Sequence, residues 1–435
     1  MSAARLREAR ASGQAGWAWR LLLLACAGTL TAQSEAQPDI KIRLVPTVAD
    51  GVFLEGAPVA MRATLRSVSG QARKGRLSWR LYDHDELVGQ AASRQTIEAQ
   101  GETVVTGKLQ PPGPGFYFVE CRYQSPGEVD AVARMRVGSD PEQIERPLTA
   151  RPDLQDFWRE TLDELGQVKP RYMVTHQPER SNDERDLYLV EMRSLGDVRV
   201  RGWLQVPKKA GPHATILRVP GYSGNMRPTS DDPDMVVFSF NIRGHGNSQQ
   251  DVSGAKQDYW VRGLDDKESY YYRGAYADCI RAVDYLCTRE DVDQDRLVIW
   301  GASQGGGLSW MTAALDPRID ACIADIPWLA DWVGYFRLTD WPEMNSWVAA
   351  RPERTWPSTY ETLSYFDTMN MADRITCPVL MRVGLQDRIC PPSTSFATYN
   401  RIAGPKNFLV YPNAGHGIGR RHRGDVDAFL GRVFD

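Results

Sequence analysis

The sequence contains little histidine, little cysteine and few long apolar runs. An abundance of any of these would by itself have indicated a class of protein. The chain contains six histidines and seven cysteines in 435 residues. No stretch beyond the first 36 residues is apolar for long enough to cross a bilayer. The net charge of −3 comes without a long basic run after the N-terminus, so nothing indicates a nucleic-acid partner. With 42% hydrophobic and 25% charged residues the composition is that of a soluble globular chain, and the length predicts two domains.

The cysteines follow no metal-binding spacing. Cys279 and Cys287 lie in a segment of helical periodicity, where a rise of about 1.5 Å per residue separates them by roughly 12 Å, too far for a disulfide. Apart from Cys26, we interpret the cysteines mostly as buried thiols that pack as small apolar side chains. The alternative, if the protein is exported, is that two of these cysteines form one disulfide. We therefore expect no metal site.

Residues 1–36 differ from the rest of the chain. Four arginines precede the apolar run Leu21–Ala27, and the small residues around Ser34–Ala36 offer a cleavage site. This pattern is typical of a secretory signal, so we expect export to the periplasm or out of the cell. The run also resembles a lipobox that ends at Cys26, in which case a lipid on this cysteine would anchor the protein. The alternative is a disordered extension or a wrongly assigned start.

Residues 37–140 are expected to form an all-β domain. Apolar and polar residues alternate in Val59–Arg66 and Leu77–Leu81, and Phe116–Tyr123 is a third strand-like run. Turn signals such as Pro111–Gly115 separate the runs. Several short strands within about 100 residues predict an immunoglobulin-like sandwich. No cluster of catalytic residue types stands out in it, so we expect it to pack against its neighbour; carbohydrate binding is the alternative.

Residues 141–435 are expected to form an α/β domain. A connector, Pro141–Pro152, leads to a helix that begins at Asp153. Short apolar strands then alternate with helical segments at residues 214–219, 235–240, 297–300, 321–326, 379–383 and 408–411. Such alternation is typical of a mostly parallel sheet covered by helices on both faces.

Two segments between these strands have distinct patterns. A helix around residues 276–287 has one apolar face, and we expect Asp278, Arg281 and Asp284 to face away from it. Residues 328–360 interrupt the alternation with five tryptophans, and we expect an insertion over the carboxyl edge of the sheet. These aromatic residues either stack on sugar rings or pack the insertion onto the body, and the sequence leaves both open.

The stretch Trp300–Gly307, WGASQGGG, places a serine in a glycine-rich turn between a strand and a helix. A serine with glycine two positions away on each side is common by chance and gains meaning only from this context. Such a turn lifts the Ser303 hydroxyl above the sheet and puts the backbone N–H of Gln304 at a helix N-terminus, facing a developing oxyanion. We interpret Ser303 as a nucleophile, and the alternative is an ordinary turn.

A serine nucleophile needs a base that a third group orients. Of the six histidines, His416 follows the last predicted strand in a loop of small residues, and Asp387 follows the fifth strand. The order Ser303, Asp387, His416 is that of an α/β-hydrolase. His422 is a rival base, but three neighbouring arginines indicate a solvated surface. We expect the backbone N–H of Tyr222, after the first core strand, to be a second oxyanion donor.

Several longer motifs carry a specific resemblance. They are PGYSG at 220–224, NIRG at 241–244, YYYRG at 270–274, GASQGGG at 301–307, GLQD at 384–387 and PPST at 391–394. With these motifs in this order, the chain from about residue 150 onward resembles the acetyl xylan esterase and cephalosporin C deacetylase family of carbohydrate esterases. The resemblance implies an α/β-hydrolase fold and hydrolysis of acetyl esters on xylose sugars or similar small molecules.

The resemblance also implies roles for individual residues. It carries the catalytic triad over to Ser303, Asp387 and His416, and the oxyanion hole to the backbone of Tyr222 and Gln304. No metal or organic cofactor is needed for this chemistry. Members of the family often form ring-shaped hexamers, so the resemblance implies a homo-oligomer, although the N-terminal β domain could block the usual hexamer.

Substrate contacts are expected at Tyr222 and Pro327. The chain departs from the family pattern at two positions: His245 stands where the family has glutamine, and Gly417 where it has glutamate. Both positions are thought to support the site, so the departures concern substrate preference and local packing more than the triad.

The sequence therefore predicts a serine esterase that releases acetate from acetylated xylan, xylo-oligosaccharides or similar small acetyl esters. Two alternatives remain. One is an α/β-hydrolase that acts on other esters or on peptides, and the other is a carbohydrate-binding protein whose hydrolase body is inactive.

Overall fold

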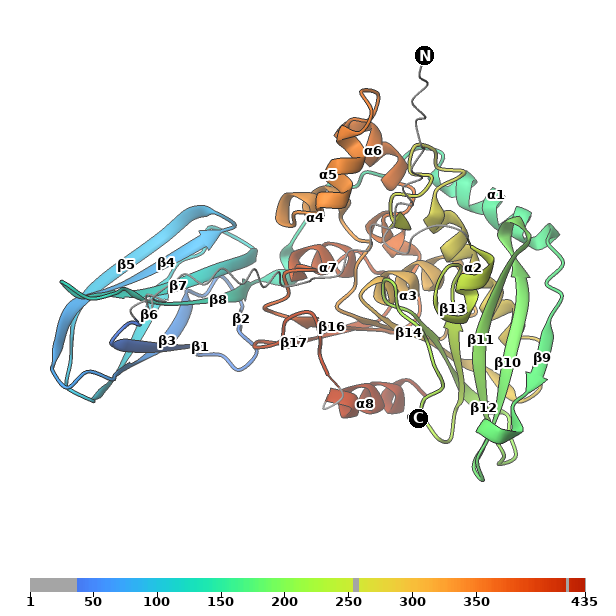
Figure 1. The fold of residues 1–435 in the computed structure, drawn as a ribbon, viewed down its shortest axis with the longest axis horizontal. Coiled ribbons are helices and arrows are strands. Elements are labelled where there is room, and N and C mark those ends of the chain that lie inside the picture. The colour runs from blue at the N-terminus through green and yellow to red at the C-terminus, as the bar shows by residue number, and fades with distance from the viewer. Residues whose placement is uncertain (1–36, 253–257, 420–421, 435) are drawn as a thin grey trace, which may run out of the picture. The chain divides into compact units, whose positions relative to one another are not determined.

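The chain forms an N-terminal β-structure of two small sheets, followed by a C-terminal β-structure of one large sheet (Figure 1). The computed structural model describes residues 37–252, 258–419 and 422–434. From Pro38 onward the chain forms one compact unit. The predicted signal segment, residues 1–36 with Cys26, lies outside the described residues. Of the helices described, none has the length and apolar character needed to cross a membrane.

The N-terminal β-structure consists of two small sheets. The first has the order β1 (Ile40–Pro46), β3 (Val59–Ser67), β6 (Glu102–Leu109). The second has the order β2 (Val52–Phe53), β8 (Ala131–Ser139), β7 (Gly115–Gln124), β4 (Arg73–Asp83), β5 (Glu86–Ile97).

The two small sheets pack face to face around one apolar core. Every second residue of β3 is buried, as the alternation predicts, and these residues meet the buried side chains of β4 and β7. The sheets approach closely at Gly107 in β6, where an added Cβ would lie 2.3 Å from the ring of Trp79. The prediction of an all-β sandwich before the α/β region is confirmed.

The C-terminal β-structure is one nine-stranded sheet. Its order is β17 (Lys406–Tyr411), β16 (Val379–Gly384), β15 (Ala321–Asp325), β14 (Val292–Ala302), β12 (His213–Val219), β13 (Val236–Asn241), β11 (Val198–Pro207), β10 (Arg185–Ser194), β9 (Met173–His176). The six strands from β17 to β13 pair in parallel, and β11, β10 and β9 continue the sheet in antiparallel fashion.

The six parallel strands are the six that the apolar runs predict. The three antiparallel strands were not among the predicted ones. Strand β9 is exposed throughout, and β10 alternates buried and partly exposed residues, so neither contains a continuous apolar run.

Helices cover both faces of the large sheet (Figure 1). The helices are α1 (Leu154–Gln167), α2 (Tyr271–Leu286), α3 (Gln304–Leu315), α4 (Trp332–Leu338), α5 (Pro342–Ala349), α6 (Trp356–Leu363), α7 (Pro392–Tyr399) and α8 (Arg423–Phe434). Short 3₁₀ segments are η1 (Pro141–Gln143), η2 (Pro178–Arg180), η3 (Leu195–Asp197), η4 (Gly246–Asp251) and η6 (Thr368–Arg374). Val426 and Phe429 of α8 pack on one face, while α2 and α3 belong to the larger core on the other.

Helix α2 is buried on both sides, which corrects one expectation. Asp278 and Arg281 do not face solvent, because Asp278 packs against Arg243 and Arg281 against the end of α1. The carboxylate of Asp278 accepts two hydrogen bonds from the Arg243 guanidinium, at 2.9 and 2.8 Å. Arg281 donates to the carbonyls of Leu165 and Val168 at the end of α1. The charged residues of α2 therefore join elements of the core.

The tryptophan-rich insertion forms α4, α5 and α6 between β15 and β16, as expected. Most of its aromatic rings pack on one another. Trp328 and Trp341 are stacked with ring centroids 5.6 Å apart, and Trp332 stacks on Phe336 at 5.7 Å. Packing of the insertion is therefore one of the two roles left open by the sequence. Trp328 and Trp341 also line the main cavity, and stacking on sugar rings stays a prediction.

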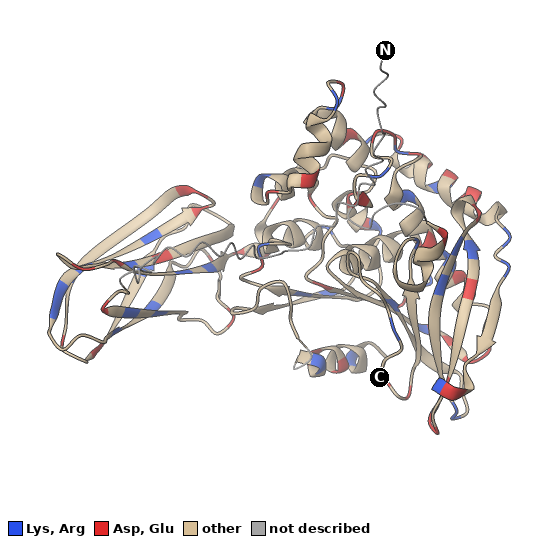
Figure 2. Ribbon diagram, viewed as in Figure 1, with Lys and Arg blue, Asp and Glu red and all other residues tan. Residues whose placement is uncertain are grey.

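Charges of both signs are interspersed along the same elements (Figure 2). Strand β10 and helix α8 each carry acidic and basic residues, as the small net charge leads one to expect.

Candidate active site

Ser303 sits at a sharp turn between β14 and α3. Its backbone has φ 59° and ψ −120°, a conformation that is costly for a residue with a side chain. The turn is closed by hydrogen bonds from the Ser303 N–H to the Asp325 carbonyl and from the Trp328 N–H to the Ser303 carbonyl, at 2.8 and 3.0 Å. An added Cβ at Gly301 would lie 2.5 Å from the Gly305 carbonyl, so the turn requires glycine there. This is the strand–turn–helix context that the sequence motif needs.

A continuous chain of hydrogen bonds joins Ser303, His416 and Asp387. The serine Oγ lies 3.1 Å from His416 Nε2, and His416 Nδ1 lies 2.8 Å from Asp387 Oδ2. Asp387 follows β16 and His416 follows β17, so the ends of neighbouring parallel strands bring the two together. The donation of Nδ1–H to the carboxylate leaves Nε2 to accept the serine proton.

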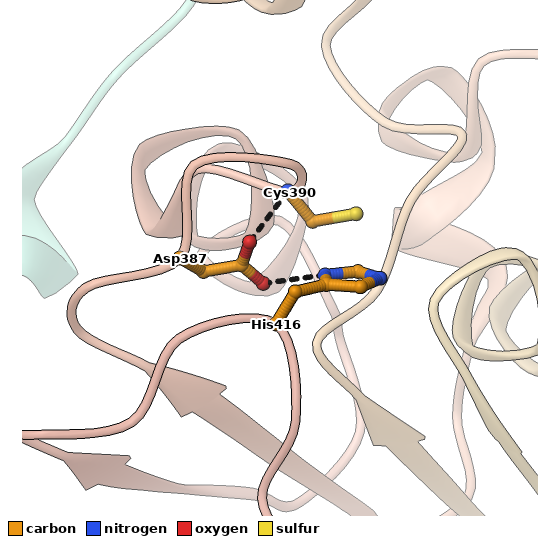
Figure 3. Close-up of side chains that lie close together, drawn as sticks. All are labelled: Asp387, Cys390 and His416. Atoms are coloured by element: carbon orange, nitrogen blue, oxygen red, sulfur yellow. Dashed lines mark hydrogen bonds and ion pairs between the residues drawn. The ribbon is translucent and has the colours of Figure 1, made fainter. Parts of the chain in front are cut away.

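The carboxylate of Asp387 is held on both of its oxygens (Figure 3). Oδ1 accepts from the backbone N–H groups of Ile389 and Cys390, at 2.8 and 2.9 Å, while Oδ2 faces the imidazole. Asp387 is fully buried, whereas 24% of the His416 side chain is exposed. The acid is therefore fixed in the interior and the base faces the cavity.

Possible metal ligands of Asp387, Cys390 and His416 all lie within 4.8 Å of one another (Figure 3). The carboxylate and Nδ1 of the imidazole already bind each other, and burial raises the pKa of the Cys390 thiol well above its usual range. A neutral thiol and a paired imidazole are poor ligands as they stand. The orienting half of a Ser-His-Asp arrangement accounts for this cluster, and the expectation of no metal stays a prediction.

Gln304, the first residue of α3, is locked in place by its side chain. Its Oε1 accepts from the Tyr272 hydroxyl at 2.7 Å, and its Nε2 donates to the Pro220 carbonyl at 3.3 Å. The backbone N–H of Gln304 is thus held at the positive end of a helix beside Ser303. Tyr222, the other predicted oxyanion donor, lies in the loop after β12, and its ring meets Trp328 edge-on at 5.6 Å.

His245 supports Gln304 from behind. The imidazole is buried, and its Nε2 lies 3.2 Å from Nε2 of Gln304, which donates to it. Its Nδ1 lies 3.2 Å from the Arg243 carbonyl and 3.1 Å from the Tyr271 hydroxyl. The imidazole accepts at one end and donates at the other, as a glutamine amide also does. This explains how histidine occupies a position where the resemblance implies glutamine.

A cavity of about 1030 Å³ opens over Ser303 and His416. Its aromatic wall includes Tyr222, Trp328 and Trp341. Gly417 also lines the cavity. A Cβ added at Gly417 would have no neighbouring atom within 4 Å, so the space beside this residue, where the resemblance implies glutamate, is open.

Pro327, a predicted substrate contact, is buried and does not line this cavity. It lies under α3, where an added Cβ at Gly306 would come within 2.8 Å of its Cα. Its neighbours Ile326 and Trp328 line the cavity instead. A substrate contact at Pro327 stays a prediction, and its two neighbours in sequence are the residues of this segment that line the cavity.

The charged part of the cavity wall was missed by sequence reasoning. Arg382 in β16 binds Asp325 in β15 with two hydrogen bonds of 2.7 Å, and Arg218 lies 3.5 Å from Asp231. The signal was present in the sequence, because Asp325 and Arg382 are charged residues in otherwise apolar strands.

The fold and the geometry of this site define an α/β-hydrolase with a serine, histidine and aspartate at the carboxyl edge of its sheet. Residues 144–431 match the sequence profile of the family described as Acetyl xylan esterase (AXE1). The chain therefore belongs to the acetyl xylan esterase family and is a carboxylic ester hydrolase.

Individual relatives agree with this assignment. Acetyl esterase Axe7A of Xylanibacter ruminicola is 29% identical over 402 residues, which cover 88% of this chain and 89% of the relative. The solved acetyl xylan esterase from Paenibacillus sp. R4 is 31% identical, with a TM-score of 0.62, over 67% of this chain and 98% of that one. Acetyl xylan esterase 1 from Thermoanaerobacterium sp. JW/SL YS485 is 27% identical, with a TM-score of 0.63, over 68% of this chain and 98% of that one.

These matches differ in what they cover. The two solved esterases are matched over nearly their whole length, so about a third of this chain has no counterpart in them. The match to Axe7A spans 88% of the chain and therefore includes part of the N-terminal β-structure. At least one relative thus shares part of that structure together with the hydrolase body.

Proposed function

We propose that this protein removes acetyl groups from acetylated xylo-oligosaccharides and similar small acetyl esters, with Ser303 as the nucleophile. The observation that carries the proposal is the hydrogen-bond chain from Ser303 through His416 to Asp387, at the floor of an open cavity. Membership of the acetyl xylan esterase family supports the choice of acyl group and sugar.

The reaction follows from the geometry. His416 Nε2 takes the proton of Ser303 Oγ as the oxygen attacks the acetyl carbonyl, and Asp387 stabilises the imidazolium that forms. The backbone N–H groups of Gln304 and Tyr222 stabilise the oxyanion, and the loss of one such donor typically costs roughly 100- to 1,000-fold in rate. The His416 imidazolium then donates this proton to the sugar oxygen as its bond to the acetyl carbon breaks, so that the sugar leaves with a free hydroxyl and the acetyl group stays on Ser303. His416 also activates the water that releases acetate from the serine.

The cavity wall supports a sugar as the leaving group. Trp341 is partly exposed and lines the cavity with Trp328, which is almost fully buried, and aromatic rings provide large contact areas for sugar rings. Two arginines of the wall are already paired, Arg382 with Asp325 and Arg218 with Asp231. The volume of the cavity is at the upper end of the range for small-molecule sites, which suits an oligosaccharide better than a bare acetyl ester.

The alternatives make different predictions. A hydrolase for bulkier esters or peptides would prefer butyryl, aromatic or peptide substrates over acetyl ones. A carbohydrate-binding protein with an inactive body would bind xylan and release no acetate, but the aligned serine, histidine and aspartate favour an active enzyme.

The test is acetate release from acetylated xylo-oligosaccharides by the full chain, beside the variant Ser303→Ala. A panel of p-nitrophenyl acetate, butyrate and benzoate measures acyl preference in parallel. We expect the wild type to release acetate, to prefer the acetyl ester, and to lose both activities in Ser303→Ala. Activity on butyrate or benzoate without acetate release would indicate an esterase for another class of ester. No activity on any ester would contradict the proposed function.

We further propose that the enzyme is exported, because residues 1–36 carry the pattern of a secretory signal. N-terminal sequencing of the mature protein from cell fractions tests this. A new N-terminus near residue 36 supports cleavage, an N-terminal lipidated Cys26 supports a membrane anchor, and full-length protein in the cytoplasm contradicts export. The oligomeric state, for which the family resemblance implies a homo-oligomer, is measured on the same sample by light scattering.

A further inference from the structure

The loop that carries Asp387 is held from two sides. On the side of the hydrolase sheet, the N–H groups of Leu385 and Gln386 donate to the carbonyls of Tyr411 and Ala414, at 3.0 and 2.8 Å. These bonds leave the outward carbonyls of the loop to be satisfied by other groups, because buried backbone carbonyls need partners.

Arg136 provides those partners from a different part of the chain. It lies in β8, the last strand of the N-terminal β-structure, and only 8% of the residue is exposed. Its Nη1 donates to the carbonyl of Leu385 at 3.2 Å and also to the carbonyl of Asp387 itself. One nitrogen thus bridges the residues on either side of Gln386.

Gln386 completes the junction in the opposite direction. Its Oε1 accepts from the backbone N–H of Arg136 at 2.9 Å, and its Nε2 donates to the backbone carbonyl of Arg136 at 3.1 Å. The same Nε2 donates to the Pro412 carbonyl at 2.7 Å, which ties the junction to the loop that leads to His416. Nearby, Gly51 packs so closely that an added Cβ would lie 2.8 Å from Leu385 Cδ2.

The surroundings of the Arg136 guanidinium hold it in place and keep it charged, so that it can donate to the carbonyls of Leu385 and Asp387. It lies over the ring of Phe118, with Cζ 4.6 Å from the centroid, which fixes its plane. Burial lowers the pKa of Arg136 to about 10, while the negative charge of Asp387 opposes that fall, so the group stays charged at neutral pH. A rigid, charged donor of this kind holds backbone carbonyls more firmly than a neutral one.

We infer that Arg136 is a positioning residue for the acid of the Ser-His-Asp site, and that the N-terminal β-structure therefore completes the active centre of the hydrolase body. The inference rests on the proposed function, since it concerns how Asp387 orients His416. Arg136 acts through the backbone of the loop and touches neither the substrate nor the reacting atoms. It also lies outside residues 144–431, which match the family profile, so the contact is a feature that the profile does not contain.

The test is the variant Arg136→Met in the full chain, which keeps the length of the side chain and removes the donors. Two control variants keep these donors. Asn400→Ala removes two other hydrogen bonds close to the junction, from the end of α7 to the carbonyls of Pro141 and Ile144 in the segment that follows β8. Arg134→Met changes the exposed arginine two residues earlier on the same strand, which binds Glu120. The kcat and KM for p-nitrophenyl acetate are measured at one pH for all four proteins.

We expect Arg136→Met to lower kcat by about 10- to 100-fold with KM within about twofold, because a shift of about 1 Å at an orienting group costs up to about 100-fold. Both controls should keep kcat within about twofold of wild type. The downfield proton resonance of the His416–Asp387 hydrogen bond, measured by NMR, should weaken or shift in Arg136→Met only. Arg136→Lys should recover part of the loss, since an ammonium group still reaches one carbonyl.

Three results would overturn the inference. They are a wild-type kcat in Arg136→Met, equal losses in Arg136→Met and Asn400→Ala, and a rise in KM without a fall in kcat. If Arg136→Met gives no folded protein, Arg136→Lys carries the test: a reduced kcat at unchanged KM supports the inference, and a wild-type kcat contradicts it. A wild type that hydrolyses no acetyl ester would instead refute the proposed function, so the two failures are distinguishable.

Discussion

Arg382 and Asp325 form a two-pronged ion pair at the base of the cavity, with Nε and Nη2 of the arginine each 2.7 Å from a carboxylate oxygen. The same carboxylate accepts from the indole N–H of Trp300 at 2.9 Å. Both charged side chains are largely buried, so each depends on the other for its polar contacts. The pair connects β15 and β16, the strands that lead to Pro327 and Asp387.

Removal of one partner of this pair should destabilise the protein strongly. Arg382→Met leaves a buried carboxylate without its counter-charge, which typically costs about 3–5 kcal/mol. We expect a large drop in the urea midpoint, whereas Arg432→Met on the exposed side of α8 should change stability by less than about 0.5 kcal/mol. Equal midpoints for the two variants would show that the pair contributes little.

The contact between His245 and Gln304 predicts which substitutions the site tolerates. His245→Gln can still accept from the Gln304 amide, so kcat should stay within about threefold of wild type. His245→Leu leaves that amide without its acceptor, at a cost of about 1–3 kcal/mol, and should lower kcat by about tenfold through movement of Gln304. Thermal melting and kcat on p-nitrophenyl acetate separate the two variants. A leucine variant as active as the glutamine variant would contradict the supporting role.

Trp341 should contribute to binding of the sugar and not to the chemistry. Trp341→Ala removes an aromatic wall of the cavity, and we expect KM for acetylated xylo-oligosaccharides to rise about tenfold, which corresponds to roughly 1.4 kcal/mol. The kinetics on p-nitrophenyl acetate should stay within twofold. Trp347→Ala is the matched control, since this tryptophan of the same insertion packs against Arg354. Equal effects of both variants on the two substrates would indicate a purely structural role.

Asp153 should stabilise the fold in a pH-dependent manner. Hydrogen bonds from Lys267 and Tyr365, at 2.6 and 2.5 Å, lower the pKa of Asp153 from 3.8 to about 2. Because the folded-state pKa is depressed, the unfolded chain binds more protons between these values, and stability falls as the pH drops through this window. The pair is partly exposed, so its contribution at neutral pH is at most about 1 kcal/mol.

The matching experiment compares wild type with Asp153→Asn by urea unfolding at pH 6 and pH 3. The difference in stability should be present in full at pH 6 and smaller at pH 3. A difference that grows as the pH falls would contradict the assigned direction of the shift.

Much of the site could be predicted from the sequence, because its chemistry leaves local signals. The glycines around Ser303 are required by the turn, and the structure places His416 and Asp387 at the ends of the predicted strands. Their mutual distances confirm that the three side chains come together. The six parallel strands were also predictable from their apolar runs. Burial on both faces accounts for these runs in the central strands, whereas the edge strand β17 is only partly buried.

The remaining features depend on contacts that sequence pattern does not show. Asp278 is buried against Arg243, and a charged residue on a helix is expected to be exposed unless such a partner is known. The edge strand β9 is exposed throughout and lacks an apolar signal. Arg136 lies about 250 residues from the loop it binds, in a strand of ordinary alternation. Which residue around Pro327 lines the cavity also depends on the fold, and in the structure these are Ile326 and Trp328.

The most direct test of the central claim is to identify the residue that attacks the ester. The full chain is treated with a fluorophosphonate, which reacts with activated serines, and the modified peptide is identified by mass spectrometry. We predict one adduct, on Ser303, whose formation abolishes p-nitrophenyl acetate hydrolysis, and no adduct in Ser303→Ala or His416→Ala. An adduct on another serine together with loss of activity, or full hydrolysis by Ser303→Ala, would contradict Ser303 as the nucleophile.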